Sequence, residues 1–223
     1  KINDILTNRH FSLLEALAEL YRVWPDALVK QRLMELIVIN TVTVRHPGYF
    51  CNIDQWQRDW KMVATLSNLR ASYGHDVECA WLVMDALRTI QVPTQSLQTW
   101  AVSLVNHSLQ YGFDSKYGGF YMGGALGKPA DDTRKEWWVQ SEAIVGLLEL
   151  YQQTGDVKYW MAFMKTLDFI EKHHLAPGGG WFATLEADGK VISSNRATMW
   201  QGPYHTGRAL LRCAKMLAAM EKK

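Results

Sequence analysis

Residues 72–81 bring together a histidine, a glutamate and a tryptophan. His75 and Glu78 are three residues apart and Trp81 follows at the same spacing, so a helix would place them on one face. A histidine beside a carboxylate is held in one orientation and can serve as a general base near neutral pH. The same residues could instead form a hydrogen-bonded core network, or bind a metal ion. We expect no metal here, because a second His-x-x-Glu pair is missing from the sequence.

Two later segments offer aromatic rings beside polar groups. Trp138 and Glu142 are one helical turn apart, and a ring next to a carboxylate can hold a sugar by stacking and hydrogen bonding. Both could equally belong to the core. Trp200 and His205 flank a predicted tight turn at the expected start of the last helix. The ten Trp and nine Tyr of the chain fit either a sugar-binding cleft or a large aromatic core.

Helices must position these side chains. Apolar residues recur at three- and four-residue spacing, which predicts helices near residues 11–21, 26–42, 81–90, 97–111, 136–154, 158–173 and 206–222. Glycine and proline mark most of the breaks. Aromatic stretches at 119–122 and 180–182 predict short hairpin strands or ordered loops. We therefore expect one all-α domain, residues 1–223, with about seven helices.

An internal repeat indicates how the helices are arranged. The string Ala-Leu-Ala-Glu-Leu-Tyr at 16–21 matches Gly-Leu-Leu-Glu-Leu-Tyr at 146–151, an offset of 130 residues. Half of that offset is 65, and steps of 66, 64 and 63 residues separate Ser12, Glu78, Glu142 and His205. A helical hairpin repeated around an axis would bring these residues to one central pocket, as in an α/α toroid. Chance similarity between helical hairpins is the alternative.

Composition excludes several classes of protein. The 223 residues include 24 Lys and Arg against 22 Asp and Glu, a scattered net charge of +2, so we expect no nucleic-acid partner. No apolar run approaches the roughly 18 residues of a membrane span. Hydrophobic residues make up 48% of the chain, enough for a sizeable core. Three cysteines without a Cys-x-x-Cys pair disfavour a disulfide framework, and we expect a cytoplasmic protein.

Three motifs, taken together, resemble those of the N-acylglucosamine 2-epimerase superfamily, most closely its cellobiose 2-epimerases. They are Ser-Tyr-Gly-His-Asp-Val-Glu at 72–78 with Trp81, Glu-Trp-Trp-Val-Gln-Ser-Glu at 136–142, and Gly-Pro-Tyr-His-Thr-Gly-Arg at 202–208 with Trp200. The resemblance implies an (α/α)6 barrel. Six hairpins of about 64 residues exceed the 223 residues here. We therefore expect a partial barrel without its first hairpins, completed by self-association or by a missing N-terminal segment.

The resemblance also implies a reaction and a set of site residues. His75 and His205 would be the acid/base pair that inverts C2 at the reducing end of an opened glucose- or mannose-type sugar or a β-1,4-disaccharide, through a cis-enediolate. The residues that would orient the histidines or bind the sugar are Asn8, Glu78, Trp81, Trp138, Glu142 and Trp200. No metal or other cofactor is implied. Ser12 stands where family members usually have a histidine.

Other functions stay open at this point. An aldose–ketose isomerase of the same superfamily, of the mannose type, would share the enediolate but return the proton to C1. A glycoside hydrolase could use Glu78 and Glu142 as its two carboxylates, although the motif histidines would then have no role. A non-catalytic sugar-binding fragment is a third alternative. In each case the partner is a small-molecule sugar, not a nucleic acid or a membrane.

Overall fold

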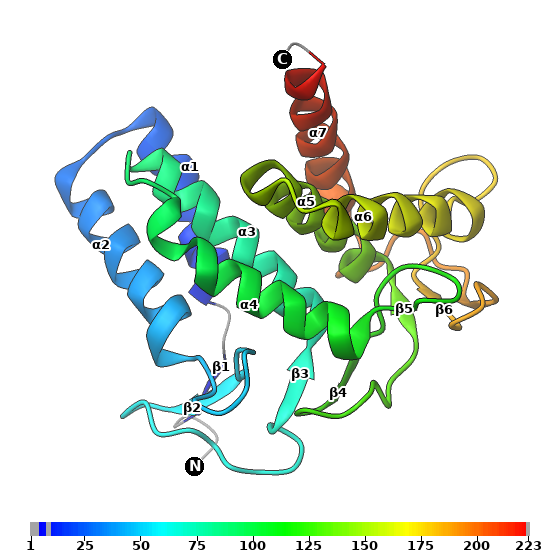
Figure 1. Cartoon of the computed structure of the whole chain (residues 1–223), viewed down its shortest axis with the longest axis horizontal. Helices are drawn as coiled ribbons and strands as arrows, with labels where there is room; N and C mark the ends of the chain where they lie inside the picture. Colours follow the sequence, from blue (N-terminus) through cyan, green and yellow to red (C-terminus); the bar gives the residue numbers. More distant parts are fainter. Residues whose placement is uncertain (1–4, 8–9, 222–223) are drawn as a thin grey trace.

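A computed structural model describes residues 5–7 and 10–221, and these form seven α-helices (Figure 1). The helices are α1 (His10–Val23), α2 (Ala27–Val38), α3 (Tyr73–Thr89), α4 (Gln95–Gly112), α5 (Trp137–Thr154), α6 (Val157–Phe169) and α7 (Pro203–Met220). Two π-helical turns, η2 (Ile39–Thr43) and η3 (Ile170–His174), extend α2 and α6. The all-α prediction and the expected number of helices are confirmed.

The helices form two layers. α1, α3, α5 and α7 contact one another in that order and make the inner layer, while α2, α4 and α6 pack on the outside of α1, α3 and α5. Figure 1 shows this as three helical hairpins side by side, followed by α7. Repetition of a hairpin around an axis is the arrangement of an α/α toroid, so the architecture that the repeat predicts is confirmed.

Local sequence signals set the ends of the helices. Asp26 and Asp156 precede α2 and α6, and each side chain accepts a hydrogen bond from the backbone N–H two residues later. Gly155 follows α5 with a φ of 69°, the left-handed conformation that commonly ends a helix. Pro203 is the first residue of α7, where its missing N–H costs no helical hydrogen bond. The connections within the pairs α1–α2, α3–α4 and α5–α6 are short, so the second helix of each pair turns back along the first.

The core lies between α3 and α5, whose side chains are buried almost throughout. Gly146 permits their close approach, because a Cβ at this position would lie 2.3 Å from Val77 Cγ1. A helix that is apolar on nearly every side packs against neighbours on every side. α3 and α5 therefore form the rigid centre to which the flanking helices are attached.

Short strands gather at the ends where the inner helices begin. β1 (Ile5–Thr7) pairs with β2 (Gln55–Gln57), and β3 (Arg70–Ser72) pairs with β4 (Gly123–Ala125). β5 (Lys135–Glu136), β6 (Thr184–Leu185) and β7 (Val191–Ser193) form a three-stranded sheet. All of these pairs are antiparallel. β3 runs directly into α3 and β5 into α5, so the pairing fixes where these helices start.

The helix starts correct one detail of the predicted repeat. α1 begins at His10, α3 at Tyr73, α5 at Trp137 and α7 at Pro203, so the sixth residues of the inner helices are Glu15, Glu78, Glu142 and Arg208. The set of equivalent residues predicted from the repeat had Ser12 and His205 in place of Glu15 and Arg208. The sequence period was correct, but Ser12 and His205 are each the third residue of their helix and lie one turn earlier.

Within the described residues, no helix is both long and apolar enough to cross a membrane.

Candidate active site

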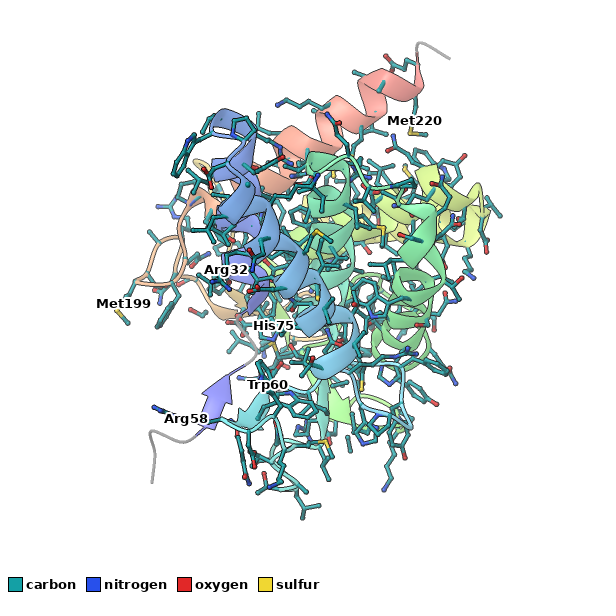
Figure 2. All side chains as sticks on the ribbon, turned by 90° about the vertical axis from the view of Figure 1, so that its left-hand side faces the viewer. Arg32, Arg58, Trp60, His75, Met199 and Met220 are labelled. Carbon is teal, nitrogen blue, oxygen red and sulfur yellow. The ribbon has the colours of Figure 1, made fainter. Side chains whose placement is uncertain are left out.

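A cavity of about 420 Å³ opens where α1, α3, α5 and α7 begin. Its wall combines two histidines, two glutamates and four aromatic rings. The lining residues are Ser12, His75, Glu78, Met122, Glu136, Trp137, Trp138, Trp200, Tyr204 and His205. Figure 2 shows His75 near the centre of the molecule, and Met199, next to Trp200, on a projecting loop. Side chains far apart in the sequence therefore share one wall.

Trp138 lies between the two histidines. The centroid of its ring is 4.8 Å from that of His75 and 5.8 Å from that of His205, and all three residues lie in the first turn of their helices. Gly74 makes room for the indole, because a Cβ there would lie 2.6 Å from a Trp138 ring carbon. Both imidazoles thus contact one aromatic ring of α5 at the wall of one cavity, and they come from α3 and α7, the two inner helices that pack against α5.

Asp54 lies beside His75. Its Oδ2 is 3.4 Å from His75 Nδ1, and it belongs to the segment between η2 and β2. A carboxylate at this distance favours one orientation of an imidazole and leaves the other ring nitrogen for chemistry. No sequence motif drew attention to Asp54, because it lies outside the strings that carry the resemblance.

His205 is oriented by Glu142. Its Nδ1 lies 2.6 Å from Glu142 Oε1, and the other oxygen of that carboxylate accepts a 2.9 Å hydrogen bond from Trp81 Nε1. Glu142 is fully buried and does not line the cavity. Because a carboxylate accepts hydrogen bonds, the Nδ1 of His205 carries the proton and Nε2 is left as the acceptor.

Arg208 joins the equivalent residues of all four inner helices. Its Nη2 donates to Glu78 Oε1 at 2.9 Å and to Glu142 Oε1 at 2.6 Å, while Nη1 lies 2.5 Å from Glu15 Oε1. Nη1 also donates to Tyr204 Oη at 2.8 Å, and Tyr204 donates to Glu15. One guanidinium therefore neutralises part of the charge of three carboxylates and fixes the start of α7 against α1, α3 and α5.

Glu78 has a perturbed acidity. Burial, followed by the charge of Glu142, raises the pKa of Glu78 well above its ordinary value of 4.5, and Arg208 opposes that shift. Burial also acts to lower the pKa of Arg208, but Glu142, Glu15 and Glu78 together raise it above its ordinary value. Glu78 therefore takes up a proton more readily than an exposed glutamate does.

The predicted site residues fall into three groups. His75, Glu78, Trp138, Trp200 and His205 line the cavity together. Trp81 and Glu142 lie beneath its wall, with Trp81 only 1% exposed and bonded to the carboxylate. Asn8 lies outside the described residues.

Sequence reasoning missed Arg208 as a site residue, although it ends the third motif. Its spacing carried a signal, because Arg208 is three residues after His205, just as Glu78 is three residues after His75. Two of its partners, Glu15 and Tyr204, come from α1 and α7 and were not singled out as site residues either.

One group at this cavity has the composition of a metal site. Single ligand atoms of Glu78, Glu142 and His205 lie within 4.8 Å of one another. Arg208 already places a cation against both carboxylates. We therefore interpret the carboxylates of this group as ion-pair partners of the Arg208 guanidinium and the His205 imidazole, and not as metal ligands.

The fold and the cavity define the class of the protein: an α/α toroid whose inner helices begin at a histidine- and tryptophan-lined cavity. The sequence pattern of the N-acylglucosamine 2-epimerase (GlcNAc 2-epimerase) family matches residues 5–209. The chain belongs to this family.

Named relatives agree with this assignment. A cellobiose 2-epimerase of Bacteroides fragilis is 32% identical over 210 residues, which are 90% of this chain and 51% of that protein. The N-acylglucosamine 2-epimerase of Bos taurus is 30% identical over 153 residues, 65% of this chain and 35% of that protein. The chain thus spans about half the length of the bacterial relative, and less of the bovine one.

Solved structures show the same partial coverage. The cellobiose 2-epimerase of Bacillus thermoamylovorans superposes with a TM-score of 0.82 at 30% identity, over 91% of this chain and 51% of that one. A D-mannose isomerase gives a TM-score of 0.82 at 20% identity, over 93% of this chain and 56% of that one, and shows a shared fold.

Proposed function

We propose that His75 and His205 are the acid/base pair of a sugar 2-epimerase, which inverts C2 at the reducing end of a glucose- or mannose-type sugar. The observation that supports this is that both line one cavity and contact Trp138 from two different helices. Inversion at carbon requires a proton to leave one face and another to arrive at the opposite face. Two separate imidazoles in one cavity meet that requirement, because an imidazole can accept a proton as a base or donate one as an acid.

The reaction follows from the acidity of the substrate. The hydrogen on C2 is acidic only when C1 is a carbonyl, so the sugar ring opens first. One histidine removes the C2 proton to give a cis-enediolate, and the other delivers a proton to the opposite face. Glu142 keeps His205 Nε2 available by accepting from Nδ1, and Asp54 places a negative charge 3.4 Å from His75 Nδ1. A positioned acid or base of this kind contributes about 10²–10⁴-fold to the rate.

The aromatic side chains have separate roles in this proposal. Trp138 and Trp200 stack on the C–H face of the sugar, and Asn8 contributes at its edge. Trp81 acts beneath the wall by holding Glu142. Glu78, which also lines the cavity, forms a hydrogen bond with a sugar hydroxyl.

The shape of the surface favours a substrate with a second sugar ring. A hollow of about 280 Å³ adjoins the first cavity and shares His75 and Met122 with it. Arg70, Asp54 and Asp132 supply charged groups there that can bind hydroxyls. A β-1,4-disaccharide could therefore place its reducing unit against the histidines and its second unit in this hollow.

Apolar faces on both flanking helices would pack against further helices. Val38 on α2 and Leu211 on α7 are 55% and 65% exposed, and each has another exposed apolar residue near it on its helix, Met34 and Leu210. Apolar patches of this kind usually mark interfaces. We propose that another copy of the chain, or an additional segment of the same protein, covers them and completes the toroid.

Incubation with cellobiose, mannose and N-acetylmannosamine in D₂O tests the function. The proposal expects deuterium at C2 and the C2 epimer as product, both read by NMR. A ketose product would indicate an aldose–ketose isomerase instead, and release of glucose from cellobiose would indicate a hydrolase. Sugar binding, measured by calorimetry, without any C2 exchange would indicate a non-catalytic binding protein.

A further inference from the structure

Three buried side chains that commonly bind metal ions meet beside the first turn of α3, outside the cavity described above. Cys51 follows η2, Asp76 lies on α3 and His107 on α4, and their ligand atoms all lie within 4.8 Å of one another. His107 Nδ1 is 4.0 Å from Asp76 Oδ2. All three side chains are more than nine-tenths buried. They come from three different segments, which a shared ligand would hold together.

The cluster contains several polar atoms without a partner. Among the described residues, Asp76 Oδ2 and both ring nitrogens of His107 have no hydrogen-bond partner. Buried polar atoms are paired in the great majority of cases. Asn52 donates its backbone N–H to Asp76 Oδ1 at 2.9 Å, which orients the carboxylate and leaves Oδ2 directed at the histidine.

We propose that Cys51, Asp76 and His107 bind a divalent metal ion of the zinc type. Sulfur, nitrogen and oxygen ligands together suit Zn²⁺ better than Mg²⁺ or Ca²⁺, which prefer oxygen alone. A thiolate and a carboxylate carry two negative charges, so a divalent ion makes the buried cluster neutral. Tetrahedral zinc needs ligand atoms about 3.3–3.8 Å apart, so the three ligand atoms, now within 4.8 Å of one another, would move closer together on binding.

A cavity borders the cluster. A cavity of about 570 Å³ is lined by His107 together with Phe50, the residue before Cys51. Tyr49, Asn106 and Tyr111 also line it. Of the three cluster residues only His107 lines this cavity, so it borders the cluster on the α4 side.

The ion would act on the sugar site through the backbone. Cys51 and Asp54 lie in the same segment between η2 and β2, and Asp54 is 3.4 Å from His75 Nδ1. Asp76 is the residue after His75. A metal that ties Cys51 to Asp76 and His107 would fix both sides of the Asp54–His75 contact. The role assigned to the metal is thus structural.

Cobalt binding to the chelator-treated protein tests the proposal. Co²⁺ bound by a thiolate absorbs in the near ultraviolet through charge transfer, and tetrahedral Co²⁺ absorbs in the visible region. We expect one equivalent of Co²⁺ per chain with both absorptions, displacement by Zn²⁺, and a higher Tm with either metal. Cys51→Ser should abolish the charge-transfer absorption.

The other two cysteines provide a matched control. The chain has three cysteines, so the double variant C79S/C213S leaves Cys51 as its single thiol. Cys79 is buried one turn after Asp76, but its thiol contacts Asn40 and Asn52 and lies outside the cluster. The double variant should retain the charge-transfer absorption. This result would identify Cys51 as the sulfur ligand without changing any residue of the cluster.

Further variants separate this site from the carboxylates at the sugar cavity. Loss of a hydrogen-bond partner outside the ligand set costs about 10–100-fold in metal affinity. His107→Gln and Asp76→Asn each change a ligand itself, so they should weaken Co²⁺ binding by more than this. His205→Gln should leave binding unchanged. The proposal is overturned if the wild-type chain shows no charge-transfer absorption, or if C79S/C213S loses it. Loss of binding in His205→Gln alone would place the metal elsewhere.

Discussion

His205 Nδ1 lies 2.6 Å from Glu142 Oε1, and this contact sets the orientation of one proposed acid/base residue from a fully buried position. Arg208 and Trp81 also donate to Glu142, at 2.6 Å and 2.9 Å. Three donors from α7 and α3 thus converge on one carboxylate of α5. The geometry makes Glu142 a positioning residue, which acts on the reaction through the imidazole.

Glu142→Gln should therefore reduce kcat more than it changes KM. The amide keeps the size of the side chain but removes the charge that orients Nδ1–H, and we expect a fall in kcat of about 10–100-fold. Glu149→Gln is a matched control, because Glu149 is also buried on α5 and pairs with Arg88 at 2.5 Å, away from the cavity. Rates of C2 exchange beside thermal melts measure both. Equal rate losses in the two variants would contradict the positioning role.

Trp138 and Trp81 should respond to truncation in opposite ways. Trp138→Ala removes a cavity-lining ring, so we expect a higher KM and a lower kcat with a modest change in Tm. Trp81→Ala empties a fully buried site, and about 3–5 kcal/mol of stability should be lost. Urea denaturation and steady-state kinetics distinguish the two. A large loss of stability in Trp138→Ala with unchanged KM would show that this ring serves the core.

Glu78 should make the stability of the protein fall as the pH rises. Its pKa is raised in the folded state, so the folded protein holds a proton that the unfolded chain releases above about pH 4.5. The contribution is fully present below that pH and is lost as the pH rises through the raised pKa. Glu78→Gln carries no such proton, so its stability relative to wild type should increase above pH 4.5. Urea denaturation measures the free energy of unfolding of both proteins at each pH. A difference between them that stays constant from pH 4.5 to 8 would contradict this.

The exposed apolar faces of α2 and α7 should make the 223-residue chain self-associate. Light scattering is expected to give a mass above that of one chain. The double variant Val38→Glu with Leu211→Glu should lower that mass, because it places charges on both faces. Leu66→Glu is the control, since Leu66 is 90% exposed in a loop away from these helices. A monomeric wild-type chain that binds no hydrophobic dye would contradict the expectation.

Much of the fold could be predicted from the sequence because each helix carries its own signal. The apolar period defines the helices, Asp26 and Asp156 begin two of them, and Gly155 ends another. The cavity-lining residues were also predictable, because His75, Trp138 and His205 each follow a break that starts an inner helix. Residues at equivalent starts of repeated hairpins meet at one end of the toroid.

Contacts between segments distant in sequence were not predictable in the same way. Spacing along α3 puts Trp81 on the same face as Glu78, but only the packing of α5 shows that its indole bonds to Glu142 beneath the cavity. Arg208 reaches three other helices with a long side chain, which no local pattern encodes. Cys51, Asp76 and His107 have no motif spacing and are brought together only by tertiary structure.

Solvent exchange at C2 in two histidine variants tests the central claim most directly. If His75 and His205 serve opposite faces of C2, removing either one abolishes epimerisation but leaves the other able to remove and return a proton on its own face. His75→Asn should then exchange C2 hydrogen for deuterium in one epimer only, and His205→Asn in the other epimer only, as NMR in D₂O would show. Near wild-type epimerisation by either variant would contradict the account.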